Sequence, residues 1–450
     1  MRSRSGRPPA GSPLPRLLSV IAVTSALVAG CSGASSPGDT GSSPAGSTPS
    51  APAASPTTTP AASPTTGATE TQTASPAATP TTSPTAAATT APAPTPTGPP
   101  VLTTSAFTVN ALEAYDEPWA ATFLGSTGYL AVTERPGRLL LRAPDGQRIT
   151  VSGVPEVAAA GQGGLGDVIT APGYDGTSNR TIYLSWAERG DGGTGAAVGR
   201  ATLAIAADGG SVRLQDLRVI WRQTPKTSGS GHYGHRLAFD PSGEHLFVTS
   251  GERQKMDPAQ DLGTTLGKIV RLTPDGQAAP GNPFANRGGV AAQIWSYGHR
   301  NPLGIAFDEQ GRLWSSEMGP RGGDELNLIT RGSNYGWPRA SDGSHYDGRD
   351  IPDHRSGDGF VAPTAFWTPS ISPAGLMIYT GSTFLWRGDA FLPALSGRGL
   401  ARVALDGTTV TARDFWDLEA RIRDVVQGPD GLIYLLEDGP NGRLLQLAPR

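Results

Sequence analysis

The chain has 450 residues, a formal net charge of −3 at pH 7 and one cysteine, Cys31. A single cysteine excludes a disulfide within the chain and a cysteine-ligated haem or iron–sulfur centre. The balanced charge, with no basic run beyond the first residues, argues against nucleic acid as a partner.

Residues 1–30 have the pattern of an export signal. Four arginines precede the apolar run LLSVIAVTSALVAG, which is too short and too early for a transmembrane span. The run ends in LVAGC, which resembles a bacterial lipobox with Cys31 as the acylated residue; the alternative is an ordinary signal peptide with an incidental cysteine. We therefore expect an exported protein, anchored by lipid at Cys31 to the outer face of the bacterial cytoplasmic membrane.

Residues 31–100 consist almost entirely of Ala, Pro, Thr, Ser and Gly, and their only charged residues are Asp39 and Glu70. Such a segment buries too little apolar surface to offset the entropy of ordering it. We expect a disordered, proline-stiffened spacer between the membrane and a folded domain at 101–450. That domain, about 350 residues long, is large enough for a core without disulfides.

One pattern recurs along the folded domain: an apolar strand, a turn of the type Asp/Glu-x-x-Gly, and an alternating strand. Clear copies are HRLAFDPSGEHLFVTSGE, PLGIAFDEQGRLWSSEMG and RDVVQGPDGLIYLLEDGPNGRLLQL. Period-two alternation bounded by Pro, Asp and Gly predicts strands and hairpins. Five or six such units predict an all-β fold, a six-bladed β-propeller of four-stranded antiparallel blades. A jelly roll or two sandwiches is the alternative, which explains the repeated turn less well.

Two polar clusters precede strands in the first half of this domain. GQGGL, at 161–165, is a glycine-rich turn that lets a ligand approach the backbone, and it includes Gln162; a turn that only connects blades is the alternative. GHYGHR, at 231–236, contains His232, a natural proton acceptor near neutral pH. Glu252, at the far end of the same hairpin, is placed to orient that imidazole. A structural histidine, or a metal site with His235, is the alternative.

A longer polar cluster follows, SYGHRNPLGIAFDEQGRLWSSEMGPRGGDELNLITRGSNYGWP. Arg300 and Asn301 lie on a loop before a strand, and Gly319 and Pro320 form a turn with exposed carbonyl groups. A pair of carboxylates, Asp324-Glu325, comes directly after this turn. Carbonyl and carboxylate oxygens are ligands suited to Ca²⁺. Ordinary turn residues with surface charge are the alternative.

The last polar cluster is RIRD, at 421–424. Alternation along a strand puts Arg421 and Arg423 on one face. Two guanidinium groups on one face can hold a dicarboxylate or another anion in a forked geometry. A solvated strand edge is the alternative.

Taken together and in this order, the clusters resemble the soluble pyrroloquinoline-quinone-dependent sugar dehydrogenases, in particular the aldose sugar dehydrogenase branch. The similarity covers most of residues 110–448. Its specific motifs are GQGGL, HYGHR, DLGTTLGKIVRL, GHRNPLGIAF, GPRGGDELNLI, NYGWP, PSISPAG and RIRDV. The resemblance implies a six-bladed propeller with pyrroloquinoline quinone (PQQ) over its central channel, together with Ca²⁺.

The resemblance also implies a role for each matched residue. The oxygens and carboxylates of the quinone would be contacted by Gln162, Arg300, Asn301, Arg421 and Arg423. Catalysis would rest on a base and two supporting residues, His232, Glu252 and Arg300. One Ca²⁺ would be held by the carbonyl groups of Gly319 and Pro320, and a second, structural Ca²⁺ by Glu325 and the backbone of Tyr335.

The implied reaction is oxidation of an aldose at C1 to a lactone. His232 would remove the proton of the anomeric hydroxyl as hydride leaves C1 for the quinone, with Ca²⁺ and Arg300 stabilising the developing negative charge. Electrons would then leave to an external acceptor, such as a cytochrome, a membrane quinone or a dye. Two positions depart from the family: the run SPAGLMIYT, which ends in Thr380, lacks the lysine that some relatives pair with the cofactor, and Gly166 replaces a bulkier apolar residue.

Two other functions stay open from the sequence. A calcium-dependent sugar lactonase would need no quinone. Its lactone substrate, however, would not require two arginines that bind a dicarboxylate, which argues against this function. A non-catalytic surface propeller, tethered through Cys31, would bind a glycan or a protein. The sequence leaves open the preferred sugar, the electron acceptor and whether the protein is a monomer or a homodimer.

Overall fold

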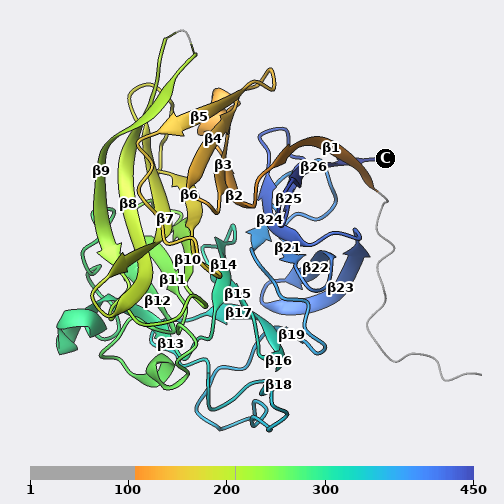
Figure 1. The fold of residues 1–450 in the computed structure, drawn as a ribbon. Helices are drawn as coiled ribbons and strands as arrows, with labels where there is room; N and C mark the ends of the chain where they lie inside the picture. Colours follow the sequence, from red (N-terminus) through yellow and green to blue (C-terminus); the bar gives the residue numbers. More distant parts are fainter. Residues whose placement is uncertain (1–106, 208) are drawn as a thin grey trace, which may run out of the picture. The chain divides into compact units, whose positions relative to one another are not determined.

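Figure 1 shows a computed structural model, which describes residues 107–207 and 209–450. The predicted signal peptide (1–30), the acylated Cys31 and the linker (31–100) lie outside the described residues and stay predictions. Helical structure in the described part of the chain is limited to short 3-10 helices: η1 (Gly125–Thr127), η2 (Asp257–Gln260), η3 (Ala285–Arg287) and η4 (Gly289–Gln293). No helix among the described residues has the length and apolar character of a membrane span.

Four antiparallel sheets of four strands each make up most of the domain. One contains β10 (Gly234–Phe239), β11 (Leu246–Ser250), β12 (Lys268–Leu272) and β13 (Ile294–Tyr297). The next contains β14 (Pro302–Phe307), β15 (Leu313–Glu317), β17 (Asp324–Ile329) and β19 (Ala365–Trp367). The third contains β20 (Met377–Ile378), β21 (Ala390–Ala394), β22 (Gly399–Asp406) and β23 (Thr409–Asp417). The fourth contains β24 (Ile422–Gln427), β25 (Ile433–Glu437), β26 (Gly442–Pro449) and β1 (Phe107–Tyr115).

The remaining large sheet has eight strands and consists of two four-stranded halves. One half contains β2 (Pro118–Phe123), β3 (Leu130–Glu134), β4 (Arg138–Arg142) and β5 (Arg148–Ser152). The other contains β6 (Leu165–Thr170), β7 (Thr181–Gly190), β8 (Gly193–Ile205) and β9 (Val212–Arg222). The halves are antiparallel inside and join through one short parallel pairing of β5 with β9. A small hairpin of β16 (Arg321–Gly322) and β18 (Gly343–Ser344) lies apart from these sheets.

The first strands of these four-stranded units form a closed ring. β2 contacts β6, β6 contacts β10, and the series continues through β14, β20 and β24 back to β2. β1, from the start of the described chain, closes the last sheet by pairing with β26, from Phe107 opposite Pro449 to Tyr115 opposite Gly442. This arrangement confirms the all-β class and the propeller-like organisation predicted from the repeats.

The repeated Asp-x-x-Gly pattern forms the hairpin turns that it predicts. Between β10 and β11, the N–H of Gly243 donates to the carbonyl of Asp240 at 2.9 Å, and Gly243 has φ +75°. Between β14 and β15, Gly311 donates to Asp308 at the same distance and has the same φ. Only glycine adopts this left-handed conformation without steric cost. The position of the glycine in the sequence therefore fixes where each hairpin turns.

The core lies between neighbouring sheets. Alternation along β11 turns Leu246 and Val248 toward β7 and β8 of the preceding unit, where they pack with Tyr183 and Val198. All four side chains are buried, and each buried aliphatic residue contributes about 1.5–3 kcal/mol. The packed interfaces between sheets hold the ring without any disulfide.

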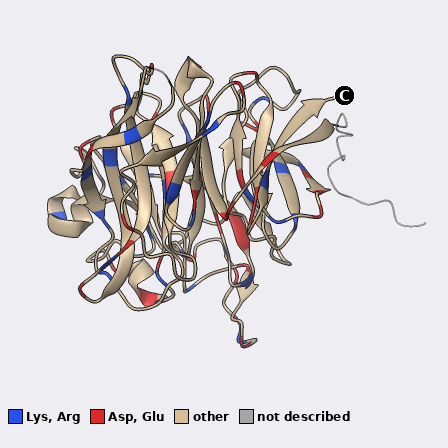
Figure 2. Cartoon of the chain, turned by 45° about the horizontal axis from the view of Figure 1, so that its top comes forward, with Lys and Arg blue, Asp and Glu red and all other residues tan. Residues whose placement is uncertain are grey.

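Charged residues of both signs are interspersed over the domain (Figure 2) and many form ion pairs. Arg402, for example, is buried on β22 and pairs with Asp389 at 2.6 Å and also with Asp414. Pairing of this kind lets a charged side chain be buried in a β-sheet core.

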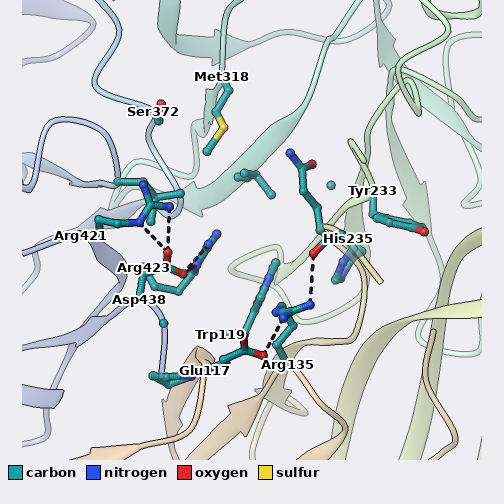
Figure 3. Close-up of a pocket in the computed structure, with 17 residues that line it drawn as sticks. Glu117, Trp119, Arg135, Tyr233, His235, Met318, Ser372, Arg421, Arg423 and Asp438 are labelled. Atoms are coloured by element: carbon teal, nitrogen blue, oxygen red, sulfur yellow. Dashed lines mark hydrogen bonds and ion pairs between the residues drawn. The ribbon is translucent and has the colours of Figure 1, made fainter. Parts of the chain in front are cut away.

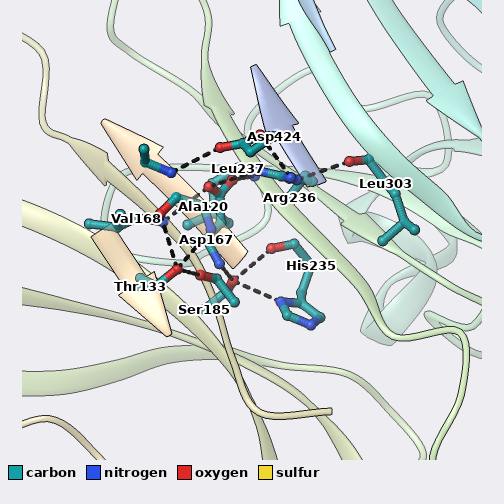
Figure 4. A network of polar contacts seen from close by, with 12 residues as sticks. Ala120, Thr133, Asp167, Val168, Ser185, His235, Arg236, Leu237, Leu303 and Asp424 are labelled. Carbon is teal, nitrogen blue, oxygen red and sulfur yellow. Dashed lines mark hydrogen bonds and ion pairs between the residues drawn. The ribbon is translucent and has the colours of Figure 1, made fainter. Parts of the chain in front are cut away.

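A buried arginine links the first strands at the centre of the ring (Figure 4). Arg236, on β10, lies 2.9 Å from Asp424 on β24 and 3.4 Å from Asp167 on β6. It also donates to the carbonyls of Leu303 on β14 and Ala374, which precedes β20. One side chain thus holds strands from five of the units in register.

Candidate functional site

A cavity of about 400 Å³ opens beside the inner strands (Figure 3). All the units of the ring contribute to its lining, which includes Glu117, Trp119, Arg135, Gln162, Tyr233, His235, Met318, Ser372, Arg421, Arg423 and Asp438. The loops that line it follow or precede the strands nearest the centre, where a propeller gathers residues from distant parts of the sequence. The cavity is large enough for a small cofactor.

His232 and Glu252 form a buried pair beside this cavity. Nδ1 of His232 lies 2.5 Å from Oε1 of Glu252, and both side chains are buried. The other carboxylate oxygen accepts the N–H of Met256 at 2.6 Å and that of Lys255. The N–H of His232 donates to Oε1 of Gln162 at 2.7 Å. The structure therefore brings together three residues that the sequence predicted for one site.

The protonation states of His232 and Glu252 allow His232 to act as a general base. Burial lowers the pKa of His232 below its usual value, and the nearby guanidinium of Arg300 lowers it further. Burial alone would raise the pKa of Glu252, but its hydrogen bond with His232 makes the net shift downward. A charged Glu252 accepts a hydrogen bond from Nδ1–H, which keeps the ring proton on Nδ1. Nε2 of His232, for which no hydrogen bond to a described residue is found, then carries the free lone pair.

The second histidine of the motif has a different position. His235 is buried, stacks on Trp119 with ring centroids 4.9 Å apart, and has Nδ1 within 2.9 Å of the Ser185 hydroxyl. Burial lowers the pKa of His235 to about 3. His235 is thus a neutral packing residue, and the two histidines do not form a shared metal site.

Arg300 and Asn301 lie next to the pair. The carbonyl of Arg300 accepts the N–H of Glu252 at 2.9 Å. Its guanidinium donates to the carbonyl of Met318 at 2.9 Å and to the hydroxyl of Tyr346 at 3.0 Å, while Nε has no partner among the described residues. The amide of Asn301 is fully buried, and neither of its atoms has a described partner.

Arg421 and Arg423 line the cavity, as the predicted anion site requires, but both are held by Asp438. Arg421 lies 2.8 Å and Arg423 2.6 Å from this carboxylate, which accepts a hydrogen bond on each oxygen. The sequence interpretation missed Asp438. The signal for it was the hairpin register, since Ile422 on β24 faces Glu437 on β25. The site is therefore a two-cation, one-anion group with an excess positive charge.

An ion pair also missed by the sequence interpretation lies across the cavity. Arg135 and Glu117 are 2.6 Å apart and both line it. Thr380 does not line this cavity; its N–H donates to the side chain of Gln427 at 2.8 Å. Gly166 is tightly packed, because an added Cβ would lie 2.0 Å from the ring of His235.

The turn at Gly319 and Pro320 is braced by Asp324. Oδ1 of Asp324 accepts the N–H of Gly319 at 2.8 Å, and Oδ2 accepts three donors of the segment 370–372. Both oxygens are thus engaged within the protein, which makes Asp324 a turn residue. Pro320 is buried. It lines neither the cavity of about 400 Å³ nor a second, smaller cavity beside Glu325.

A cavity of about 10 Å³ lies behind Arg300 and is lined by Gly319, Glu325 and Tyr335. Its volume suits a single water or ion. Burial raises the pKa of Glu325 well above its usual value, and the charge of nearby Glu317 raises it further. No described residue donates to the carbonyl of Tyr335. The described residues contain no cluster of three or more His, Cys, Asp or Glu side chains able to hold a metal, so a cation here would depend on carbonyl oxygens and one carboxylate.

Comparison with known proteins identifies the family. The model of the family described as Glucose / Sorbosone dehydrogenase matches residues 115–446. The aldose sugar dehydrogenase YliI of Escherichia coli (strain K12) is 42% identical over 343 residues, covering 74% of this chain and 91% of that protein.

Solved structures agree with this match. The soluble aldose sugar dehydrogenase from Escherichia coli in its apo-form is 40% identical, with a TM-score of 0.71 and coverage of 77% and 100% of the two chains. The PQQ-bound aldose sugar dehydrogenase from Streptomyces coelicolor is 29% identical, with a TM-score of 0.63 and coverage of 78% and 100%. The chain belongs to the glucose/sorbosone dehydrogenase family, which confirms the family and the enzyme class predicted from its motifs.

Proposed function

We propose that this protein oxidises aldose sugars at C1 to lactones, with pyrroloquinoline quinone and Ca²⁺ as cofactors. The observation that carries the proposal is the His232–Glu252 pair, in which a buried carboxylate fixes the imidazole beside a cavity of about 400 Å³. Family membership supports it, because matched relatives are named aldose sugar dehydrogenases and one of their structures is PQQ-bound.

The polar groups around the cavity fit the quinone. Arg421 and Arg423 supply cations for its carboxylates. Gln162 lines the same cavity, and Arg300 and Asn301 carry buried polar atoms without a described partner. Such atoms are rare in folded proteins, so these residues have hydrogen-bonding capacity for a ligand. The quinone, when bound, supplies a two-electron acceptor for hydride.

The chain's own residues handle the proton and the charge. Nε2 of His232 accepts the proton of the C1 hydroxyl, a step that general bases accelerate about 10²–10⁴-fold. Glu252 holds the proton on Nδ1 and stabilises the imidazolium that results. Arg300, fixed through Met318, presents positive charge where negative charge develops on the acceptor side.

The calcium part of the proposal rests on oxygen donors. The carbonyl groups of Gly319 and Pro320 would hold the ion that polarises the cofactor. Glu325 and the carbonyl of Tyr335 would hold the structural ion, and the small cavity between them supports this assignment. A cation there would relieve the burial and the repulsion that raise the pKa of Glu325.

We also propose that the domain has six blades. Four four-stranded sheets and two four-stranded halves of the eight-stranded sheet would each count as one blade. The ring of contacts among β2, β6, β10, β14, β20 and β24 supports this count.

The proposal also covers the electron acceptor and the cellular location of the protein. Electrons would leave to an external acceptor, a cytochrome, a membrane quinone or a dye in the assay. The chain would be exported and held at the membrane through lipid on Cys31, followed by the linker at 31–100; the LVAGC motif supports this part.

The test is reconstitution of the purified chain with PQQ and Ca²⁺, followed by dye-linked oxidation of a panel of aldoses. The expected product is the lactone of each oxidised sugar, identified by chromatography. Bound quinone with no oxidation of any aldose would contradict the proposal. Hydrolysis of sugar lactones by quinone-free, Ca²⁺-loaded protein would instead indicate a lactonase, and sugar binding without turnover would indicate a binding propeller.

A further inference from the structure

Tyr346 is an exposed aromatic residue next to the proposed catalytic residues. Its exposed fraction is 73%, whereas the neighbouring Trp337 is 5% exposed. Despite this exposure, its hydroxyl accepts a hydrogen bond from Arg300 at 3.0 Å. This bond ties the position of the ring to that of Arg300.

The backbone around Tyr346 also holds it in place. The hairpin of β16 and β18 pairs Arg321 with Ser344 directly before it. A turn then follows in which the N–H of His345 donates to Arg349 at 2.9 Å and Gly348 donates back to His345 at 2.9 Å. These bonds fix the loop that carries the ring.

Arg300 lies between two aromatic rings. Its guanidinium carbon is 5.2 Å from the ring centroid of the buried Trp337 and 5.8 Å from that of the exposed Tyr346. Arg300 is only 5% exposed, so Tyr346 covers it and presents most of its own ring to solvent. The same guanidinium is close enough to lower the pKa of His232. Tyr346 is therefore the solvent-exposed member of the group of side chains around Arg300.

This combination suits a sugar. An aromatic ring offers an apolar face for the C–H side of a pyranose, while polar groups at its edge bind hydroxyls. An exposed ring that a loop holds beside the proposed catalytic residues is placed to contact a substrate. A ring that only covered Arg300 would not need most of its surface in water.

We infer that Tyr346 is an aldose-binding residue of this protein. Its ring packs against the sugar, and the hydrogen bond with Arg300 fixes the orientation of the ring. The inference rests on the proposed function, since it names a contact of the same substrate. Tyr346 acts in binding and takes no part in proton or hydride transfer.

The experiment compares Tyr346→Ala and Tyr346→Phe with the unaltered full chain. D-Glucose binding is measured by titration calorimetry with Ca²⁺, with and without reduced quinone, and KM and kcat are measured with dye. Quinone binding is followed by absorbance. Leu385→Ala is the control, because Leu385 is 92% exposed and lies between β20 and β21, away from the Arg300 cluster.

Tyr346→Ala is expected to weaken D-glucose binding and raise KM by about tenfold, with kcat changed less and the quinone titration unchanged. Tyr346→Phe keeps the ring but loses the hydrogen bond with Arg300, and it is expected to weaken binding by about threefold, less than Tyr346→Ala. Leu385→Ala is expected to change nothing.

Three results would overturn the inference: glucose affinity of Tyr346→Ala within twofold of the unaltered chain, loss of quinone binding in that variant, or no glucose binding by the unaltered chain. A chain that binds glucose but does not oxidise it with bound quinone would refute the proposed function alone. The calorimetric comparison would then still decide the role of Tyr346.

Discussion

Replacing Glu252 with glutamine tests the pair at the centre of the site. The substitution preserves the shape of the side chain and one oxygen that can accept the Nδ1 proton of His232, but it removes the negative charge. In the native pair the two atoms are 2.5 Å apart and both side chains are buried. Little solvent is present to screen the interaction or to replace it.

The expected magnitude follows from this geometry. A hydrogen bond to a charged group is worth about 1.5–3 kcal/mol, which corresponds to a decrease of roughly 10- to 150-fold in kcat/KM. The loss arises because the imidazolium formed in the reaction no longer faces a carboxylate.

The pH dependence gives a second readout. Burial lowers the pKa of His232, and Glu252 partly offsets this effect. Without the carboxylate, the pKa of His232 falls further. A base works in its neutral form and loses activity as pH falls below its pKa. The acid limb of the kcat/KM profile in Glu252→Gln should therefore move to lower pH, although the plateau is lower.

The assay is dye-linked initial rates from pH 4 to 9 with protein saturated in quinone and Ca²⁺. Glu244→Gln is the matched control, because Glu244 is an exposed carboxylate on the same hairpin and should leave the profile unchanged. A plateau within twofold of the native value, with an unmoved acid limb, would refute the reasoning about Glu252.

Three further predictions concern the buried cluster of Arg236 with Asp167 and Asp424, called the hub from here on, the anion site at Arg421 and Arg423, and calcium. Arg236→Met should lower the free energy of unfolding by about 3–5 kcal/mol, since it leaves two buried carboxylates unpaired; urea titration measures this. Arg423→Gln should weaken quinone binding about 10- to 100-fold, and Arg421→Gln less, because the Arg421 side chain is 49% exposed and that of Arg423 only 15%. Ca²⁺ at a hundredfold excess over the Kd of the structural site should stabilise the chain by about 2.7 kcal/mol through that site. Glu325→Gln should lose this part of the stabilisation and keep only what the ion at Gly319 and Pro320 contributes; thermal unfolding with and without chelator checks this.

Each of these predictions has a contradicting result. For the hub, Arg349→Met is the control, because its ion pair with Asp347 is exposed and should contribute little; an equal loss in both variants would count against the hub. For the anion site, equal effects of the two arginines would contradict the argument from burial. For calcium, stabilisation of Glu325→Gln by Ca²⁺ equal to that of the native chain would place the structural ion elsewhere.

The parts of the fold that depend on residues close together in the sequence could be predicted from the sequence. The Asp-x-x-Gly pattern predicted the hairpin at Gly243 because a glycine with positive φ and a short turn are local properties. The closure of the last sheet by β1 was not predicted. It pairs Phe107 with Pro449, and no local pattern shows that the two ends of the domain meet.

The site divides in the same way. His232 and Glu252 stand at the two ends of one hairpin, and the antiparallel pairing of its strands brings these ends together. Asp438 was missed because its contact with two arginines depends on the register of β24 with β25. Tyr346 was missed because a loop brings it back to Arg300 over 46 positions. A side chain whose role depends on contacts between distant parts of the sequence can be identified only in the folded chain.

The most direct test of the account is reduction of bound quinone by D-glucose in the absence of an acceptor. The native protein and His232→Ala are loaded with PQQ and Ca²⁺, matched for quinone bound, and followed by stopped-flow absorbance. The account predicts equal quinone binding and a reduction rate about 10²–10⁴-fold lower in His232→Ala. Equal reduction rates in the two proteins would contradict it.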